Sequence, residues 1–231
     1  MPFRAAVRGP AASSSPRESE AAHVDIGLVD LVADDEAVAR AETLLVPAEL
    51  ARARRGTPEV HRRRVLLRAA LRSALGHQLG MDPRSVPLGT SPAGRPYVEP
   101  APGRAPLDVS CSASGTLGIV AVGRDCVIGI DIEVVAPWSP DVLDERWLSS
   151  SEQLALGRLP LSARPRAVTR CWTQKEAVLK ARGTGLHEDP AGTVTAVGRP
   201  NGRVSGWQLQ DVPVPDGWIA SLAVGAEERP S

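Results

Sequence analysis

Aromatic residues are scarce in this chain of 231 residues: they make up 3% of it, and five of the seven are Trp. Because hydrophobic residues still reach 42%, the core must be built mainly from Leu, Val, Ala and Ile. A chain of this length suits one large domain or two small ones. Long apolar runs are missing as well. No stretch approaches the ~20 residues of a membrane helix, and we expect neither a membrane span nor a signal peptide.

Cysteine is rare and shows no pairing pattern. Cys111, Cys126 and Cys171 are odd in number, form no CxxC and lack a nearby His that would complete a zinc site. This usage is typical of a reducing compartment, so we expect a cytoplasmic protein. Lys plus Arg and Asp plus Glu both total 27, and the zero net charge argues against a nucleic-acid binder or a membrane-surface protein.

The N-terminal part of the chain predicts a tail, a strand and a long helix. Residues 1–22 are rich in Ala, Ser, Pro and Arg without a hydrophobic period, so we expect a flexible tail. Residues 24–32 partly alternate and predict a strand. Thr57, followed by Pro and Glu, predicts a helix start, and Gly76 predicts its end. We expect that helix to carry a basic face of Arg62, Arg63, Arg64, Arg68 and Arg72.

The C-terminal part mixes strands with a second long helix. The apolar runs 117–122 and 127–132, joined by GRDC, predict a β-hairpin. A helix is expected over 167–181, ending at Gly183, and short strands are expected at 193–197, 204–210 and 218–224. Because helices and strands are mixed without strict βαβ alternation, the sequence favours an α+β fold with antiparallel pairing.

Two acids interrupt the apolar run IGIDIEVV. Asp131 and Glu133 lie two positions apart, so on a strand their side chains point to the same face. Two adjacent carboxylates repel each other, and a hard divalent cation such as magnesium would relieve that repulsion. The alternative is an edge strand whose acids face solvent, and the pattern alone leaves both open.

Two further groups of charged residues each allow two interpretations. Glu176 and Lys180 are four apart on the expected second helix and share a face, as a surface ion pair or as part of a site. Arg is dense from Arg52 to Arg72, which indicates either a solvated helix face or a phosphate site, since the guanidinium fork suits phosphate oxygens.

Taken together, these signals resemble the 4'-phosphopantetheinyl transferases, in particular the larger, pseudo-dimeric type that activates peptide and polyketide synthases. Residues 129–133, GIDIE, look like the family's G-[IV]-D-[IV]-E motif. Residues 172–185, WTQKEAVLKARGTG, look like its W-x-x-K-E-A-x-x-K-x-x-G-x-G motif. Gly94-Arg95-Pro96 resembles the earlier G-[KR]-P motif. The likeness spans roughly residues 24–225.

The resemblance implies an α+β fold of two similar α/β halves related by a pseudo-twofold, with a coenzyme A cleft between them. After the tail at 1–22, an N-terminal half would span 23–125 and a C-terminal half with the metal site would span 126–231. A monomer is expected, because one chain supplies both halves.

The resemblance also implies a reaction and its residues. The protein would move 4'-phosphopantetheine from coenzyme A to a serine of an acyl or peptidyl carrier protein and release 3',5'-ADP. The metal, Mg²⁺ or else Mn²⁺, would be held by Asp131, Glu133 and Glu176. Glu176 would be the general base, directly or through a metal-bound water, with Lys180 and Asp131 as the other catalytic residues. Coenzyme A would be bound by Arg54, Arg55, Arg63, Arg95, Ser110, Cys111, Lys175 and Lys180.

Some details stay open at this stage. The family usually has S-H-S where this chain has Ser110-Cys111-Ser112, and a neutral thiol is a poor donor to phosphate. Lys175 either faces the cleft or pairs with an acid. Carrier docking is expected at the basic helix face of 62–72 or between Asp141 and Ser162, with no nucleic-acid or membrane partner. The alternatives are a non-catalytic coenzyme A or carrier-binding protein, and a metal-dependent nuclease, which would need E-x-K on a strand.

Overall fold

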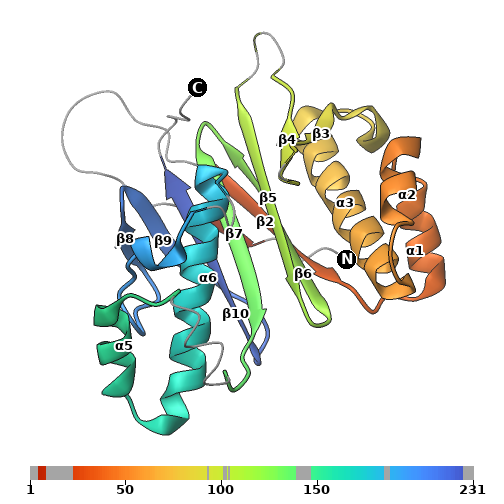
Figure 1. The fold of residues 1–231 in the computed structure, drawn as a ribbon. Coiled ribbons are helices and arrows are strands. Elements are labelled where there is room, and N and C mark those ends of the chain that lie inside the picture. Colours follow the sequence, from red (N-terminus) through yellow and green to blue (C-terminus); the bar gives the residue numbers. More distant parts are fainter. Residues whose placement is uncertain are drawn as a thin grey trace. The chain divides into compact units, whose positions relative to one another are not determined.

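The structure is a computed structural model that describes residues 5–8 (backbone only), 23–92, 94–100, 103, 105–138, 147–184 and 188–225 (Figure 1). These residues form two compact units. The first comprises the described residues up to Cys111 together with Thr116–Val127, and the second comprises Ser112–Gly115 and the described residues from Ile128 onward. The family resemblance predicts a boundary between residues 125 and 126.

The first unit is a four-stranded sheet covered by helices. Its elements are β1 (Ala5–Arg8), β2 (His23–Asp30), α1 (Asp35–Glu42), α2 (Pro47–Ala53), α3 (Pro58–Leu79), η1 (Pro83–Ser85), β3 (Leu88–Thr90), β4 (Pro96–Val98), β5 (Leu107–Ser114) and β6 (Leu117–Arg124). The strand order is β1-β2-β6-β5, and β2 pairs antiparallel with both β1 and β6. Short strands β3 and β4 form a separate ribbon.

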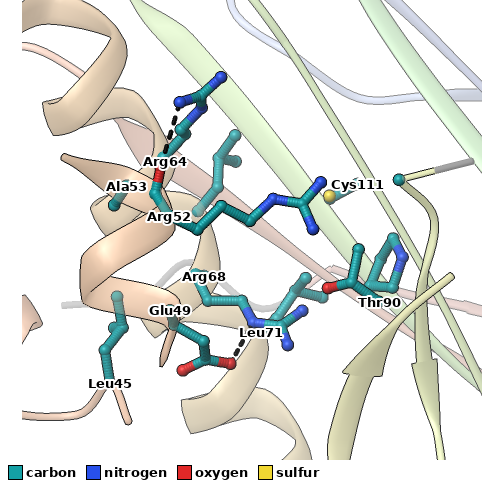
Figure 2. Close-up of a pocket in the computed structure, with 12 residues that line it drawn as sticks. Leu45, Glu49, Arg52, Ala53, Arg64, Arg68, Leu71, Thr90 and Cys111 are labelled. Atoms are coloured by element: carbon teal, nitrogen blue, oxygen red, sulfur yellow. Dashed lines mark hydrogen bonds and ion pairs between the residues drawn. The ribbon is translucent and has the colours of Figure 1, made fainter. Parts of the chain in front are cut away.

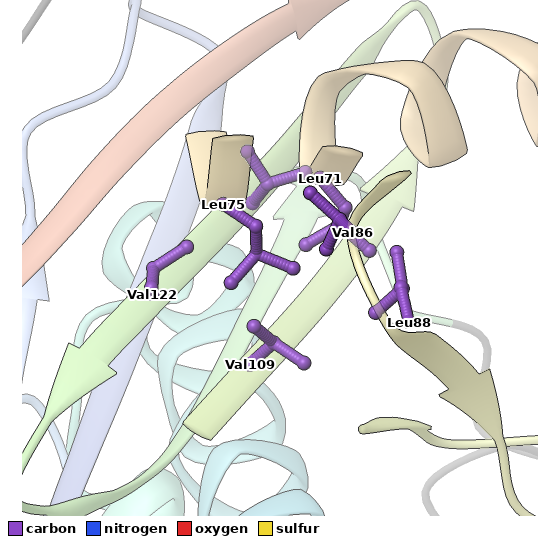
Figure 3. Packing of buried hydrophobic residues seen from close by; sticks show 7 residues of the cluster. Leu71, Leu75, Val86, Leu88, Val109 and Val122 are labelled. Atoms are coloured by element: carbon purple, nitrogen blue, oxygen red, sulfur yellow. The ribbon is translucent and has the colours of Figure 1, made fainter. Parts of the chain in front are cut away.

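Helix α3 packs on β2 and β6, and α1 and α2 pack against α3. Apolar side chains from α3, the β3 region and the sheet meet in one buried cluster, shown in Figure 3: Leu71, Leu75, Val86, Leu88, Val109, Val120 and Val122. Burying branched aliphatic side chains on both surfaces stabilises the layer without aromatic residues, as the composition requires.

Helix α3 starts as predicted but ends later. The Thr57 hydroxyl accepts from the backbone N–H of Val60, and Pro58 occupies the first turn. The helix ends at Gly80, whose φ of 64° is left-handed, and not at Gly76. A Cβ on Gly76 would lie 2.8 Å from the Met81 carbonyl oxygen, so this glycine serves close packing inside the helix.

Two further expectations are wrong. Within the expected tail, Ala5–Arg8 form strand β1, while the rest of 1–22 lies outside the described residues. The expected hairpin does not form either, because β6 pairs with β2 in the first sheet while β7 (Val127–Val134) belongs to a different sheet. Both are continuous apolar runs, and such runs do not encode which strand they pair with.

The second unit is a four-stranded sheet with a long helix. Besides β7 its elements are α5 (Ser150–Gly157), η2 (Leu161–Ala163), α6 (Arg164–Arg182), η4 (Pro190–Gly192), β8 (Gly202–Val204), β9 (Trp207–Val212) and β10 (Trp218–Gly225). The strand order is β7-β10-β9-β8, and α6 packs on β10. Helix α6 ends at Gly183 as predicted, with a φ of 78° there. Beside α5, the rings of Trp138, Trp147 and Trp172 pack together.

Two strand predictions in this unit are also wrong. The expected strand 204–210 is a hairpin of β8 and β9, turned at Ser205, whose φ is 48°, and Gly206, whose φ is 88°. The segment 193–197 is not a strand, because its backbone is bound by buried side chains: the Thr195 N–H donates to Glu152 and the Thr193 carbonyl accepts from Lys175. None of the helices in the described part of the chain has the length and apolar character to span a bilayer.

Candidate active site

Strand β7 presents its two acids on one face. Ile128, Ile130 and Ile132 are fully buried on the alternate positions, which fixes the orientation of the residues between them. Asp131 is only 2% exposed, and Glu133 is half-buried. Strand β7 is at the edge of its sheet in the described part of the chain, but the expectation that its acids face solvent is wrong for Asp131.

Gly129 brings α6 against this face of β7. A Cβ at Gly129 would lie 1.9 Å from the Ala177 carbonyl oxygen and 2.5 Å from the Ala181 backbone nitrogen. Only a residue without a side chain allows the helix backbone to approach so closely. Consequently Glu176 and Lys180, which neighbour those two alanines, come within reach of the acids on β7.

Lys180 binds Asp131 directly. Its ammonium lies 2.6 Å from Asp131 Oδ1 and donates to the Ser112 hydroxyl over 2.9 Å. The Ser112 hydroxyl donates to the same Asp131 oxygen at 2.6 Å. The neighbouring Ser114 hydroxyl donates to Glu133 Oε2 at 2.6 Å. The structure thus brings together the sequence-predicted Asp131 and Lys180, and it adds two serines.

Glu176 interacts electrostatically with Asp131, Glu133 and Lys180. Burial raises the pKa of Glu176 above its ordinary value, and the negative charges of Asp131 and Glu133 add to this, although Lys180 opposes it. A carboxylate whose pKa is raised in this way is a better proton acceptor at neutral pH than an exposed one.

The carboxylates fit a hard divalent cation in donor type. Asp131 Oδ2 and Glu176 Oε1 are buried and have no hydrogen-bond partner among the residues that the structure describes, so both oxygens are open to a ligand. Oxygen donors of this kind suit Mg²⁺ or Mn²⁺. Among the described residues, however, no three metal-binding side chains stand close enough together to form a ready-made set. In this arrangement the ammonium of Lys180 supplies the positive charge beside Asp131.

Lys175 pairs with an acid, which is one of the two roles that the sequence left open for it. Its side chain is fully buried, and its ammonium lies 2.8 Å from Glu152 Oε2, 2.9 Å from the Pro190 carbonyl and 2.7 Å from the Thr193 carbonyl. These three acceptors use all three ammonium protons. The structure therefore supports the interpretation that Lys175 is the partner of an acid.

The first unit holds a cavity of about 230 Å³ beside the G-[KR]-P motif (Figure 2). Arg52, Arg64 and Arg68 line it together with Thr90, Gly94, Pro96 and Cys111. Figure 2 shows Arg52 extending into the cavity, and a Cβ on Gly94 would lie 3.9 Å from its Nη2. Within the described part of the chain the Arg52 guanidinium forms no ion pair, which leaves its charge for an anionic ligand.

The arginines of α3 do not form one solvated basic face. Arg72 is 2% exposed and lies 2.7 Å from Glu49 Oε2, and Arg68 is bound to the same carboxylate. Burial alone would raise the pKa of Glu49, but the hydrogen bonds from Arg72 and Arg68 outweigh it and the pKa is lowered. The basic docking face predicted for 62–72 therefore lacks two of its members.

The other predicted coenzyme A contacts fall in two groups. Cys111 lines the cavity, Ser110 next to it is buried, and Arg95 binds the Asp108 carboxylate at 2.9 Å. Arg54, Arg55 and Arg63 are exposed and do not line the cavity, so their role stays a prediction.

Some site residues were missed by sequence reasoning. Ser112 and Ser114 alternate on their strand as Asp131 and Glu133 do, and this period of two was the available signal. Arg52 and Arg64 lay inside the Arg-rich stretch, but their contact with the G-[KR]-P region depends on tertiary packing. Gly185, the last position of the long motif, lies outside the described residues.

Comparison with known proteins identifies the family. Residues 127–210 match the 4'-phosphopantetheinyl transferase superfamily. The chain is 33% identical over 189 residues to the 4'-phosphopantetheinyl transferase HetI of a Nostoc species, covering 76% of each chain. The protein therefore belongs to the 4'-phosphopantetheinyl transferase superfamily, as its motifs predicted.

Two more distant relatives are similar over a shorter part of their length. The chain is 33% identical over 170 residues to the L-aminoadipate-semialdehyde dehydrogenase-phosphopantetheinyl transferase of Eremothecium gossypii, covering 68% of this chain and 58% of that protein. It is 29% identical over 116 residues to a 4'-phosphopantetheinyl transferase of Bacillus subtilis, covering 50% of each.

Proposed function

We propose that this protein transfers 4'-phosphopantetheine from coenzyme A to a serine of an acyl or peptidyl carrier protein, releasing 3',5'-ADP. The observation that carries the proposal is the ion pair of Asp131 and Lys180 at 2.6 Å. Glu176 interacts electrostatically with both residues, and all three occupy positions of the two family motifs. Family membership supports a transferase acting on carrier domains with coenzyme A as its substrate.

Coenzyme A would be bound through its phosphates. Arg52 and Arg64 line the cavity and are the candidates for binding a phosphate. A guanidinium group can donate two parallel hydrogen bonds to phosphate oxygens. The exposed Arg54, Arg55 and Arg63 remain candidates for the 3'-phosphate. The pseudo-twofold relation of the two units and the coenzyme A cleft between them also remain predictions.

The reaction is a phosphoryl transfer. The carrier serine oxygen forms a bond to the β-phosphorus of coenzyme A, and the bond from that phosphorus to the bridging oxygen breaks, so the electron pair leaves with 3',5'-ADP. Glu176 takes the proton of the attacking hydroxyl as general base. Lys180 offsets the negative charge that develops on the phosphate oxygens.

Asp131, Glu133 and Glu176 would hold Mg²⁺, with Mn²⁺ as the alternative. A bound divalent cation would neutralise charge on the pyrophosphate and orient it. The two unpartnered carboxylate oxygens, Asp131 Oδ2 and Glu176 Oε1, support this assignment.

The carrier would dock on the segment from Asp141 to Ser162, of which residues 141–146 lie outside the described part of the chain. The described remainder exposes two large apolar side chains, Leu154 at 60% and Leu161 at 76%. Exposed leucines near one another in the chain are suited to an apolar partner surface.

Neither alternative has an observation in its favour. A non-catalytic binding protein would not need the complete set of acids and Lys180. A nuclease would need its Glu and Lys on a strand, whereas Glu176 and Lys180 extend from helix α6.

The proposal is tested by incubating the protein with coenzyme A and an apo carrier domain and measuring the release of 3',5'-ADP by chromatography. Lys180→Ala should lower kcat at least about 100-fold, because one charge-stabilising donor is lost. Arg170→Ala is the matched control on the same helix, since its partner is Asp211 at 2.7 Å and not the acidic cluster. Carrier-dependent release that survives Lys180→Ala would contradict the role of Lys180.

A further inference from the structure

We infer that Ser112 and Ser114 are positioning residues: they hold the carboxylates of Asp131 and Glu133 in place, and Ser112 holds Asp131 so that its Oδ2 is left for a ligand. This inference rests on the proposed function and deepens it. The two serines contact the acidic residues and act through them. Their hydroxyls serve neither as nucleophiles nor as bases.

The two contacts form a repeating pattern. Ser112 donates to Asp131 and Ser114 donates to Glu133, both at 2.6 Å and both across 19 positions of sequence. A constant offset means that the two segments run in the same direction past each other, with alternate side chains facing. Each carboxylate on β7 therefore has its own hydroxyl from the end of β5.

Hydrogen bonding of one oxygen leaves the other available. Asp131 Oδ1 accepts from both Ser112 and Lys180, while Asp131 Oδ2 is buried without a partner. A buried unpaired carboxylate oxygen costs free energy unless something binds it. The Ser112 hydroxyl thus helps to hold Oδ1, and Oδ2 is the oxygen that is left for a cation.

Ser112 also links Lys180 to the acid. The Lys180 ammonium donates to the Ser112 hydroxyl at 2.9 Å, so one hydroxyl orients both charged groups. Ser114 is anchored independently: its hydroxyl accepts from the Val134 N–H at 3.1 Å, and its carbonyl accepts from the Trp218 indole at 3.2 Å. The positions of both hydroxyls are therefore set by the fold before any ligand binds.

Groups that orient metal-binding carboxylates typically change metal affinity by about 10- to 100-fold when they are removed. Ser112→Ala and Ser114→Ala should each weaken Mn²⁺ binding to this extent, measured by electron paramagnetic resonance of free Mn²⁺ with coenzyme A present. In kinetic assays kcat should fall while KM for the carrier stays unchanged. Ser112→Thr keeps the hydroxyl and should restore affinity.

Ser221→Ala is the matched control, because its buried hydroxyl bonds Thr173 at 2.8 Å away from the acids. That variant should lower the melting temperature and leave Mn²⁺ affinity unchanged. Mn²⁺ affinity within twofold of wild type in Ser112→Ala and Ser114→Ala would overturn the inference, and so would a wild-type protein that binds no Mn²⁺. If serine-dependent Mn²⁺ binding occurs but no carrier is modified, the proposed function fails and the positioning role stands.

Discussion

Lys175 and Lys180 both extend from α6, yet their ammonium groups have different surroundings. Lys175 is enclosed by Glu152 and two backbone carbonyls, whereas Lys180 is 26% exposed and bound to Asp131. The family motif contains both lysines, and the motif alone does not separate them. Their burial does: one fastens α5 and the 190–193 segment to α6, and the other faces the acids.

The Glu152 and Lys175 pair makes stability depend on pH. Burial alone would raise the pKa of Glu152, but hydrogen bonds from Lys175, Thr195 and Ser149 lower it below the ordinary 4.5. The stabilising contribution is therefore complete above the unfolded pKa and is lost as the pH falls through the folded pKa. The free energy of unfolding, measured by urea denaturation, should fall as the pH drops below about 5.

Glu152→Gln leaves the Lys175 charge buried without its partner and should destabilise the protein by about 3–5 kcal/mol. Combining it with Lys175→Met removes the charge as well and should recover part of that loss. The folded double variant should also retain transfer activity. A well-folded double variant without activity would show that Lys175 has a role beyond structure.

Cys111 occupies the position where the family usually has His. Its thiol lines the cavity that Arg52 enters, and an imidazole there would add a hydrogen-bond donor for phosphate. We expect Cys111→His to lower KM for coenzyme A or leave it equal, with kcat unchanged, as measured by steady-state kinetics. A large loss of activity would give Cys111 a function of its own.

At the scale of elements, the approach of α6 to β7 decides whether the site forms. Gly129→Ala would place a methyl group 1.9 Å from the Ala177 carbonyl oxygen, so helix and strand must separate. We expect a melting temperature at least several degrees lower, by thermal denaturation, and a large loss of transfer activity. Gly202→Ala is the matched control, since no atom lies within 4 Å of its added Cβ. An unchanged Gly129→Ala protein would contradict this packing.

Element boundaries were predictable where capping chemistry is local. Thr57 with Pro58 marked the start of α3, and Gly183 marked the end of α6. Gly76 was misleading, because a glycine required for close packing looks the same in sequence as one that ends a helix. Segment 193–197 was misleading for a related reason: its backbone partners, Lys175 and Glu152, are distant in sequence.

At the scale of the molecule, two motifs were enough to predict the family and the acidic residues. They could not predict the neighbours of those acids. Ser112 and Arg52 take their roles from packing between distant segments, and the spacing of two between Ser112 and Ser114 does not by itself identify the acids that they contact. Cys111 also shows that a motif position predicts where a residue lies in the fold more firmly than it predicts which contact that residue makes.

Partner recognition is tested on the surface of the second unit. Leu154→Asp and Leu161→Asp should raise KM for the carrier about 10-fold or more without changing coenzyme A binding, because a charge replaces an exposed apolar contact. Both constants can be measured by steady-state kinetics with calorimetry for coenzyme A. Val32→Asp, at a position 67% exposed in the first unit, is the control. Unchanged carrier KM in both leucine variants would place docking elsewhere.

Intact mass spectrometry of an apo carrier domain tests the central claim most directly. The carrier is incubated with this protein, coenzyme A and Mg²⁺, and a parallel sample contains EDTA. The account predicts a mass gain of one phosphopantetheine arm that EDTA abolishes and Mn²⁺ restores. No gain on any of several carriers, with coenzyme A still bound to the protein, would contradict it and favour a non-catalytic binding protein.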